Sequence, residues 1–306
     1  MKLNITGYST ALFSTWYFIE ELNLLFDAGD GITSGLLQKS KKVKNAFISH
    51  ADRDHMGGLL QFNQLNGYGD PATVYYPRDC GSFPNMNAFA QKFDPHVEGV
   101  HWLPMNEKEP IHLKNDLMVI PFRNQHIPAP PDKVKSLSFH VYRVKRKLKP
   151  EFYTLSGLEI KELRETKGED FVTTEVRENI LSYSGDTPIE WDGRYKDSKI
   201  LIHEATFLQD DPSIIDKDRM NKHSFLEDVI KMVADSNIEK LILGHFSSRY
   251  SDKEIDLAIQ THCKNYKIKI PVYRLLPGRI HRDILGSEAI WSNSPLPLSS
   301  QGEETG

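Results

Sequence analysis

Residues 47–58 read F-I-S-H-A-D-R-D-H-M-G-G. An apolar run ends within this stretch and is followed by four side chains of the kinds that bind metal ions: His50, Asp52, Asp54 and His55. A rigid strand that ends in a tight loop and leads into a helix can direct ligands at i, i+2, i+4 and i+5 into one site. The alternative is a polar loop with two incidental histidines. The interleaved aspartates and the Gly57-Gly58 pair that follows them favour the metal site.

The composition is that of an ordinary globular protein with room for a large core. The chain has 306 residues, 39% of them hydrophobic and 26% charged, which permits one large domain or two small ones. Its net charge of −4 does not indicate a nucleic-acid-binding protein but leaves room for a local basic patch. Cys80 and Cys263 are too few for a disulfide framework or a thiolate zinc site. No apolar run reaches the ~18 residues that span a bilayer, and no signal peptide is recognisable, so we expect a cytoplasmic protein that does not associate with membranes.

A second pattern recurs along the chain: an apolar strand whose C-terminal end carries an acidic residue or a histidine. Such runs lead to His126, Asp186, Glu204 and His245. Asp27 also ends an apolar run, and we expect it to orient loop backbone or to support a metal ligand from behind. Ligands that arrive from the ends of separate strands form a deep site between two sheets. With helices interspersed in both halves, the pattern favours an α/β protein with four layers: helices, sheet, sheet and helices.

The remaining segments are assigned from their periodicity and composition. Apolar periodicity predicts helices over residues 32–40, 84–93 and 252–265. The densest basic segment spans residues 143–149, and residues 151–178 are predicted to be a polar surface excursion before a strand that starts at residue 180. We place one folded domain over residues 1–285. Residues 286–306, rich in Ser, Pro, Glu and Gly, are predicted to be a disordered tail.

The chemistry-bearing motifs occur in an order that resembles a known superfamily. H-x-D-x-D-H, then His126, then S-G-D-T and G-H-F-S-S-R-Y resemble the metallo-β-lactamase superfamily. Within it, H-E-A-T-F, K-H-S and H-F-S-S-R-Y are similar to motifs of ribonuclease Z, the tRNA 3′-processing endonuclease. The resemblance extends from about Leu3 to about Leu276. It implies the metallo-β-lactamase αβ/βα four-layer sandwich, a binuclear zinc centre and a homodimer.

The resemblance also assigns the ligands of the two metal ions, with Asp186 bridging them. One ion would be held by His50, Asp52, His126 and Asp186. The other would be held by Asp54, His55, Asp186 and His245. Two metal ions lower the pKa of a shared water molecule and hold the oxygens of an in-line displacement. The expected reaction is therefore attack of a metal-bridging hydroxide on a phosphodiester.

Three residues have catalytic roles implied by the resemblance. Asp54 would position the hydroxide or accept its proton. His223 would stabilise the phosphorus oxyanion or protonate the leaving oxygen, and Glu204 would hold the tautomer of His223. The alternative is that His223 and Ser224 only cap the amphipathic helix that follows them.

The sequence departs from the ribonuclease Z pattern in three places. Asp52 stands where the family usually has a histidine. A carboxylate is a harder ligand, so manganese or iron could replace zinc, and the metal cluster should be roughly neutral. The family's Pro-Thr-x-x-Arg-Asn loop is absent, and residues 8–16 read Y-S-T-A-L-F-S-T-W instead. Residues 147–178 stand in the place of the family's tRNA-gripping arm but lack its Gly-Pro-rich motif, which indicates a remnant arm or a surface insertion.

These features leave three hypotheses for function. In the first, the protein is an RNA-processing endonuclease that removes the 3′ trailer of pre-tRNA, and residues 143–149 grip phosphates. In the second, it is a phosphodiesterase of a small diester such as a cyclic nucleotide, and the remnant arm lines a pocket or a dimer seam. In the third, it binds metal without turnover, for which Asp52 is the only support. The His223–Glu204 pair argues against the third hypothesis, and H-E-A-T-F with K-H-S indicates phosphorus rather than carbonyl chemistry.

Overall fold

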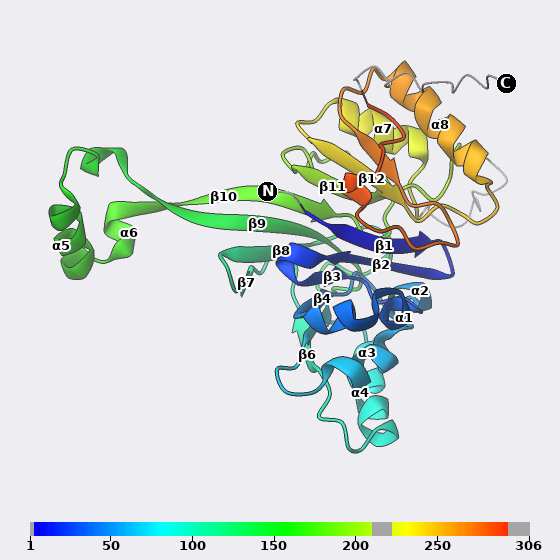
Figure 1. The fold of residues 1–306 in the computed structure, drawn as a ribbon, viewed down its shortest axis with the longest axis horizontal. Helices are drawn as coiled ribbons and strands as arrows, with labels where there is room; N and C mark the ends of the chain where they lie inside the picture. The colour runs from blue at the N-terminus through cyan, green and yellow to red at the C-terminus, as the bar shows by residue number, and fades with distance from the viewer. Residues whose placement is uncertain (1–2, 210–221, 293–306) are drawn as a thin grey trace, which may run out of the picture.

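The computed structural model describes residues 3–209 and 222–292, which contain two β-sheets packed on each other (Figure 1). In the first sheet an antiparallel hairpin continues into parallel strands, in the order β1-β2-β3-β4-β5-β6. Its strands are β1 (Ile5–Thr10), β2 (Ser14–Ile19), β3 (Leu24–Phe26), β4 (Asn45–Phe47), β5 (Thr73–Pro77) and β6 (His101–Met105).

The second sheet has the order β13-β12-β11-β10-β9-β8-β7. It is parallel from β13 to β10 and antiparallel from β10 to β7. Its strands are β7 (Ile111–Leu113), β8 (Leu117–Arg123), β9 (Leu137–Leu148), β10 (Thr173–Tyr183), β11 (Ile200–Glu204), β12 (Lys240–Gly244) and β13 (Val272–Arg274).

Alternating apolar side chains on the strands explain the layers of the fold. On β2, Tyr17 and Ile19 face the core between the two sheets, whereas Trp16 and Phe18 face the helices on the outer side. A separate apolar cluster joins the outer face of the second sheet to its own helices. The order of layers is thus helices, sheet, sheet and helices. This confirms the α/β, αβ/βα sandwich expected from the sequence.

The helices cover the two outer faces. They are α1 (Ile32–Leu36), α2 (Arg53–Met56), α3 (Leu59–Asn66), α4 (Ser82–Phe93), α7 (Leu226–Ala234) and α8 (Asp252–Asn265), whereas α5 (Gly157–Lys167) and α6 (Glu169–Val172) lie away from both sheets (Figure 1). The predicted helix over 252–265 is confirmed as α8, whose start is stabilised by a capping box between Ser251 and Glu254. The helix expected over 32–40 is divided between α1 and a 3-10 helix, because Leu37 leaves the α-helical region.

Strands β9 and β10 extend far beyond the rest of their sheet as a two-stranded arm (Figure 1). We call residues 143–149 with 173–178 the stalk, and residues 150–172, which include α5 and α6, the tip. Residues 151–178 are mostly exposed and protrude from the body, as a surface excursion would, but they contain helices and the first half of β10. The strand expected from residue 180 therefore begins earlier, at Thr173. Charged side chains on both faces of a solvated hairpin leave no apolar period that would reveal the strand.

The folded domain continues beyond the boundary predicted at residue 285. The indole N–H of Trp291 donates to the backbone oxygen of Ile268 at 2.9 Å, and Trp291 pairs with the backbone of Val272. Residues 286–292 are thus attached to the second sheet, and the rest of the predicted tail lies outside the described residues. Within the described part of the chain, no helix has the length and apolarity required to cross a membrane.

Candidate metal centre

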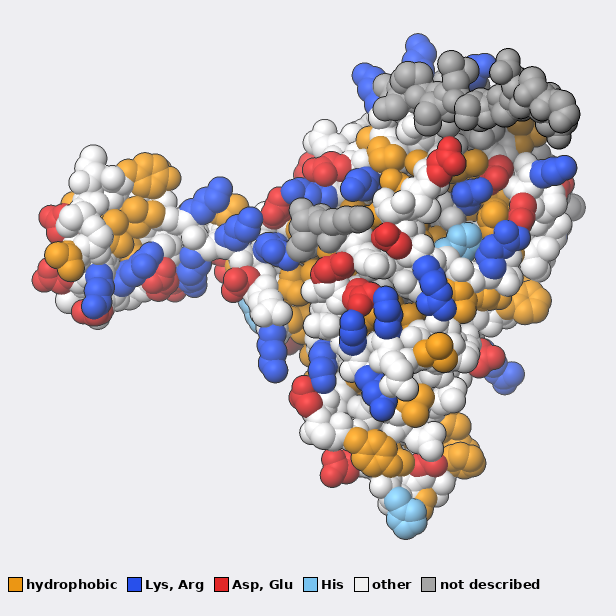
Figure 2. All heavy atoms as spheres, in the orientation of Figure 1, with side chains coloured by type: hydrophobic (Ala, Val, Ile, Leu, Met, Phe, Trp, Pro, Cys, Tyr) orange, Lys and Arg blue, Asp and Glu red, His pale blue; other side chains and the backbone are white. Residues whose placement is uncertain are grey.

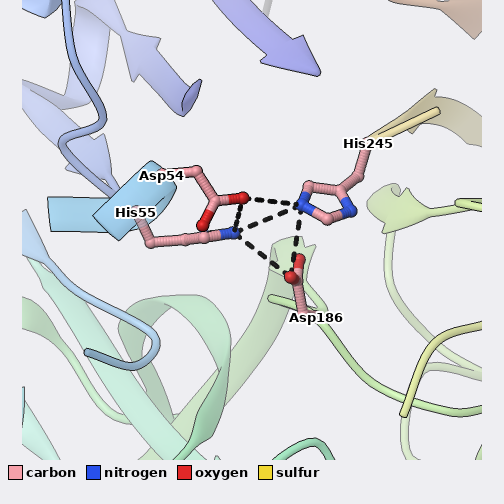
Figure 3. A group of neighbouring side chains, drawn as sticks. All are labelled: Asp54, His55, Asp186 and His245. Carbon is pink, nitrogen blue, oxygen red and sulfur yellow. Dashed lines mark hydrogen bonds and ion pairs between the residues drawn. The ribbon is translucent and has the colours of Figure 1, made fainter. Parts of the chain in front are cut away.

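Four candidate ligands from distant parts of the chain lie within reach of one metal ion (Figure 3). They are Asp54, His55, Asp186 and His245. Asp186 Oδ2 lies 3.2 Å from both His55 Nε2 and His245 Nε2, and these two nitrogen atoms are 3.3 Å apart. Asp54 Oδ2 completes the group at 3.5 Å from His55 Nε2 and 3.4 Å from His245 Nε2. The fold thus brings together the four residues that the resemblance assigns to one ion.

A second group, His50, Asp52 and His126, lies beside the first. Asp52 Oδ2 is 3.6 Å from His50 Nε2 and 3.5 Å from His126 Nε2. Asp186 Oδ2 is 3.8 Å from His50 Nε2, so the Asp186 carboxylate lies between the two groups. His50 Nε2 is buried and makes no hydrogen bond. A buried polar atom of this kind requires an explanation, and a metal ion would supply the missing partner.

Each of the four imidazoles in the two groups is held through Nδ1, which leaves Nε2 for a metal ion. The Nδ1 partners are Ser49 Oγ for His50 (2.9 Å), Asp27 Oδ2 for His55 (2.7 Å), the backbone oxygen of Lys222 for His126 (2.9 Å) and Thr206 Oγ1 for His245 (2.9 Å). Contacts of this type fix both the tautomer and the orientation of a metal-binding ring.

Asp27 supports the centre from behind, as the sequence interpretation expected. Besides contacting His55, its carboxylate accepts hydrogen bonds from Ser49 N (2.7 Å), Ser49 Oγ (2.9 Å) and Tyr183 Oη (2.5 Å). Asp27 (φ +54°) and His245 (φ +60°) both adopt the left-handed backbone conformation. Non-glycine residues seldom adopt it, and such strain gathers at functional sites where the surrounding structure enforces it.

Asp54 and His55 lie on the short helix α2 rather than in the loop that the sequence suggested. This helix is tied to the segment after Asp27, since Ala28 N–H donates to His55 O and Gly58 N–H donates to Ala28 O, each at 2.8 Å. A Cβ atom on Gly58 would collide with the backbone oxygen of Gly29. The glycine that follows the ligands is therefore required for the close approach of the two segments.

His223 lies at the edge of the centre and pairs with Glu204. The distance from His223 Nδ1 is 3.0 Å to Glu204 Oε1 and 3.9 Å to Asp186 Oδ2. Burial lowers the pKa of His223, but the Glu204 carboxylate outweighs burial and raises the pKa to about 9. The alternative helix-capping role is contradicted, because α7 begins after Phe225 and no side chain caps it.

The charges of the centre suit divalent cations. Burial raises the pKa of Asp186, but His245 and His55 outweigh burial and lower this pKa well below its usual range. The neighbouring imidazoles of His126 and His50 likewise lower the pKa of Asp52. Burial lowers the pKa of His55, and the carboxylates around it raise that pKa well above its ordinary value. Protons on imidazoles thus balance the buried carboxylates, and divalent cations bound by neutral imidazoles would do the same.

The candidate ligands fit metal ions by their residue types, their convergence and the open Nε2 atom of His50. Sequence reasoning missed three residues that hold them: Ser49, Tyr183 and Thr206. Ser49 and Thr206 stand inside the quoted motifs, so the motifs could have indicated them. Tyr183 has no such signal, because it lies on β10 of the second sheet and contacts Asp27, which follows β3 of the first sheet and is 156 residues away in the chain.

Comparisons with known proteins agree with this geometry. The family model for the β-lactamase superfamily domain matches residues 22–246. The chloroplastic tRNase Z TRZ2 of Arabidopsis thaliana is 28% identical over 263 residues, which cover 83% of this chain and 70% of that protein. Ribonuclease Z of Staphylococcus epidermidis is 24% identical over 284 residues, which cover 83% of this chain and 84% of that protein.

Among solved structures, the short form of human tRNase Z aligns with a TM-score of 0.56 at 16% identity. The alignment covers 91% of this chain and 98% of that one, and it supports the fold. The family match covers most of the described residues and includes the candidate ligands from His50 to His245. The chain therefore belongs to the metallo-β-lactamase superfamily, is related to ribonuclease Z, and is a metal-dependent hydrolase.

Proposed function

We propose that the protein is a binuclear phosphodiesterase that cleaves RNA, with the 3′ trailer of pre-tRNA as its substrate. Two divalent ions would share Asp186; the remaining ligands would be His50, Asp52 and His126 for one ion and Asp54, His55 and His245 for the other. Zinc is the expected metal, and the harder Asp52 ligand would also suit manganese or iron. When bound, such ions activate water for attack on phosphorus and neutralise the phosphate oxygens.

The protein's own groups would orient the reactants and move the proton. His223 would donate a proton to the leaving oxygen, because Glu204 keeps the imidazole of His223 protonated. The His223 side chain is also 23% exposed, so an incoming substrate can reach it. Glu204 Oε2 accepts from Thr206 Oγ1 at 2.5 Å, which orients the carboxylate. Asp54, ionised because His245 and His55 outweigh the effect of its burial and lower its pKa, would position the attacking water or accept its proton.

The charge of the stalk is the observation that favours RNA over a small diester. The stalk carries six basic residues and two acidic ones. Along β9, Arg143, Lys145 and Lys147 alternate and therefore share a face. Strand β9 starts beside the metal centre, because Leu137 N–H donates at 2.9 Å to the backbone oxygen of Ser49, the residue before His50. At about 3.3 Å per residue, Lys147 lies roughly 33 Å along the strand from that point, a span that a polynucleotide covers and a mononucleotide does not.

A hollow of about 610 Å³ at the base of the arm adds to this argument. Its lining includes the side-chain amides of Asn179 and Asn237 and has more basic than acidic side chains: Lys145, Lys147, Arg177, Arg194 and Lys199 against Glu178, Asp197 and Glu239. Cations and amides are the groups that proteins commonly direct at phosphate and sugar oxygens. The hollow is thus suited to the backbone of an RNA whose scissile phosphate lies at the metal centre.

The tip has the opposite charge, with six acidic residues against three basic ones. Figure 2 shows basic side chains along the stalk, and acidic and apolar side chains gathered at the tip. Repulsion between carboxylates and phosphates disfavours contact of the tip with RNA. We therefore restrict the proposed RNA contact to the stalk and the body.

Cleavage of a pre-tRNA at increasing salt tests the proposal. Phosphate contacts release counterions, so kcat/KM should fall steeply between about 50 and 200 mM salt. A panel of pre-tRNA, cyclic mononucleotides and a chromogenic diester, with metal analysis of the same sample, identifies the substrate class. Rapid turnover of a cyclic nucleotide without cleavage of pre-tRNA would replace the RNA proposal by the small-diester hypothesis. Bound metal without any turnover would favour the third hypothesis.

A homodimer and a cytoplasmic location are further parts of the proposal. Both rest on the relation to ribonuclease Z and on the composition of the chain. Analytical ultracentrifugation of the full chain tests the dimer, and fractionation of the source cells tests the location.

A further inference from the structure

The turn between β1 and β2, residues 11–13, lies against the metal centre but presents two large apolar side chains to solvent. Leu12 N–H donates to Asp54 Oδ2 at 3.1 Å, which places the turn in contact with a proposed metal ligand. Leu12 is 87% exposed and Phe13 is 62% exposed. What distinguishes them from other exposed apolar residues is that they are adjacent to each other and lie beside the proposed reaction centre, where a substrate could cover them.

The backbone of the turn is fixed on both sides. Ala11 N–H donates to the backbone oxygen of Phe246, the residue after His245, at 3.2 Å. Ser14 Oγ donates to the backbone oxygen of Asp30 at 2.7 Å. Phe13 N–H closes the turn by donating to Thr10 O at 3.1 Å. The exposed side chains are therefore carried by a rigid support whose position relative to the centre is set.

Leu12 also adopts an unusual backbone conformation, with φ +70°. Leucine seldom occupies this left-handed region, and such strain persists where the surrounding structure enforces it, commonly at functional sites. In the observed conformation the N–H of Leu12 reaches Asp54 while its side chain remains in solvent. The strained backbone of Leu12 thus holds an exposed apolar side chain next to Asp54, a proposed metal ligand.

We propose that Phe13, flanked by Leu12, is a stacking platform for an unpaired base next to the scissile phosphate. This inference rests on the proposed RNA substrate. Proteins hold unpaired bases by stacking them on aromatic side chains, and this contact tolerates any base because every base has an aromatic face. The stalk is proposed to bind phosphates, whereas the platform would add a stacking contact with a base, which phosphate binding does not supply. Because only an unpaired base can stack on Phe13, the proposed substrate is RNA that is single-stranded at the cleavage point.

A binding experiment with the metal-loaded enzyme tests the contact directly. The probe is an RNA in which a methylene phosphonate replaces the scissile diester and 2-aminopurine stands on either side of it in turn. Stacking quenches 2-aminopurine, so one of the two RNAs should lose fluorescence on binding. Phe13→Ala should abolish this quenching and Phe13→Tyr should retain it. Phe93→Ala is the matched control, because Phe93 on α4 is also 62% exposed. Unchanged quenching in Phe13→Ala, or quenching in neither RNA, overturns the platform.

A kinetic cycle separates failure of the platform from failure of the proposed function. Removing the base beside the scissile phosphate, or replacing Phe13 by alanine, should each lower kcat/KM about 10-fold. The two changes together should cost no more than either alone, and additive losses overturn the platform. If the unaltered chain cleaves no RNA, the proposed function fails and the platform fails with it. If Phe13→Ala instead changes the mass of the particle by light scattering, the turn is a contact between copies, which also overturns the platform.

Discussion

The metal centre and the arm differ in how their side chains are held. In the centre, His50, His55 and Asp186 are almost wholly buried and every imidazole has a partner for Nδ1. In the tip of the arm, Val172 is the one buried residue of 150–172. The bond-making groups of an enzyme must be positioned to fractions of an ångström, which buried and satisfied contacts achieve. Charge-based contact with a phosphate chain tolerates exposed and less constrained side chains.

The comparison predicts that substitutions in the centre remove activity outright, whereas substitutions in the arm change affinity by modest and salt-dependent factors. A single lost ligand leaves a buried carboxylate without its counter-charge. A single lost stalk cation removes one contact among several. The experiments that follow run from the largest expected effect to the smallest.

His245→Ala should abolish turnover and lower the metal content of the protein. The substitution removes an Nε2 atom that lies 3.2 Å from Asp186 Oδ2 and an Nδ1 atom that lies 2.9 Å from Thr206 Oγ1. Metal analysis by mass spectrometry and a chromogenic diester assay measure the two effects. Full metal content in the variant would remove His245 from the proposed ligand set.

His223→Ala should cut kcat by about 10²- to 10⁴-fold, the usual contribution of a positioned general acid. The metal content should stay unchanged, because Nδ1 of His223 faces Glu204 at 3.0 Å and no proposed ligand set includes it. Parallel metal analysis and steady-state kinetics check both statements. Loss of metal would show that His223 is a ligand, and full activity would exclude it as the acid.

Glu204→Gln should shift the alkaline limb of the kcat–pH profile to lower pH. The folded-state pKa of His223 is raised to about 9, so the protonated form is present below that pH and is lost as the pH rises through it. If the pKa returns to an ordinary value of about 6.5, the protonated fraction falls about 30-fold at pH 8 but less than about two-fold at pH 6. A variant that is equally impaired at pH 6 and pH 8 would contradict the role of Glu204 in holding the proton.

Replacing Lys145 and Lys147 by alanine should give the smallest effect. Each lysine is proposed to contact a phosphate, so the slope of log K against log salt for RNA binding should become shallower by about 1 per lysine. The same double change at Lys161 and Lys167 removes equal charge from the tip and should leave the slope unaltered. Fluorescence anisotropy with a pre-tRNA at several salt concentrations measures both variants. A larger loss from the tip variant would reverse the comparison between stalk and tip.

Local motifs made most of the centre predictable. His50, Asp52, Asp54 and His55 stand within one short stretch, and Asp186 and His245 each follow an apolar strand, so residue type and place indicate the chemistry. The length of the arm was not predictable in this way. Its two strands are solvated on both faces, and without a buried face their side chains have no period to show.

The sequence by itself determined the ligand types, the alternating apolar strands and the basic segment, because each is a local property of neighbouring residues. The tertiary structure alone decided that Asp186 lies between two ligand groups, that Asp27, just after β3, contacts His55 on α2, and that Leu12 N–H donates to Asp54. These contacts join residues far apart in the chain. Their geometry depends on how the two sheets pack, which no local pattern records.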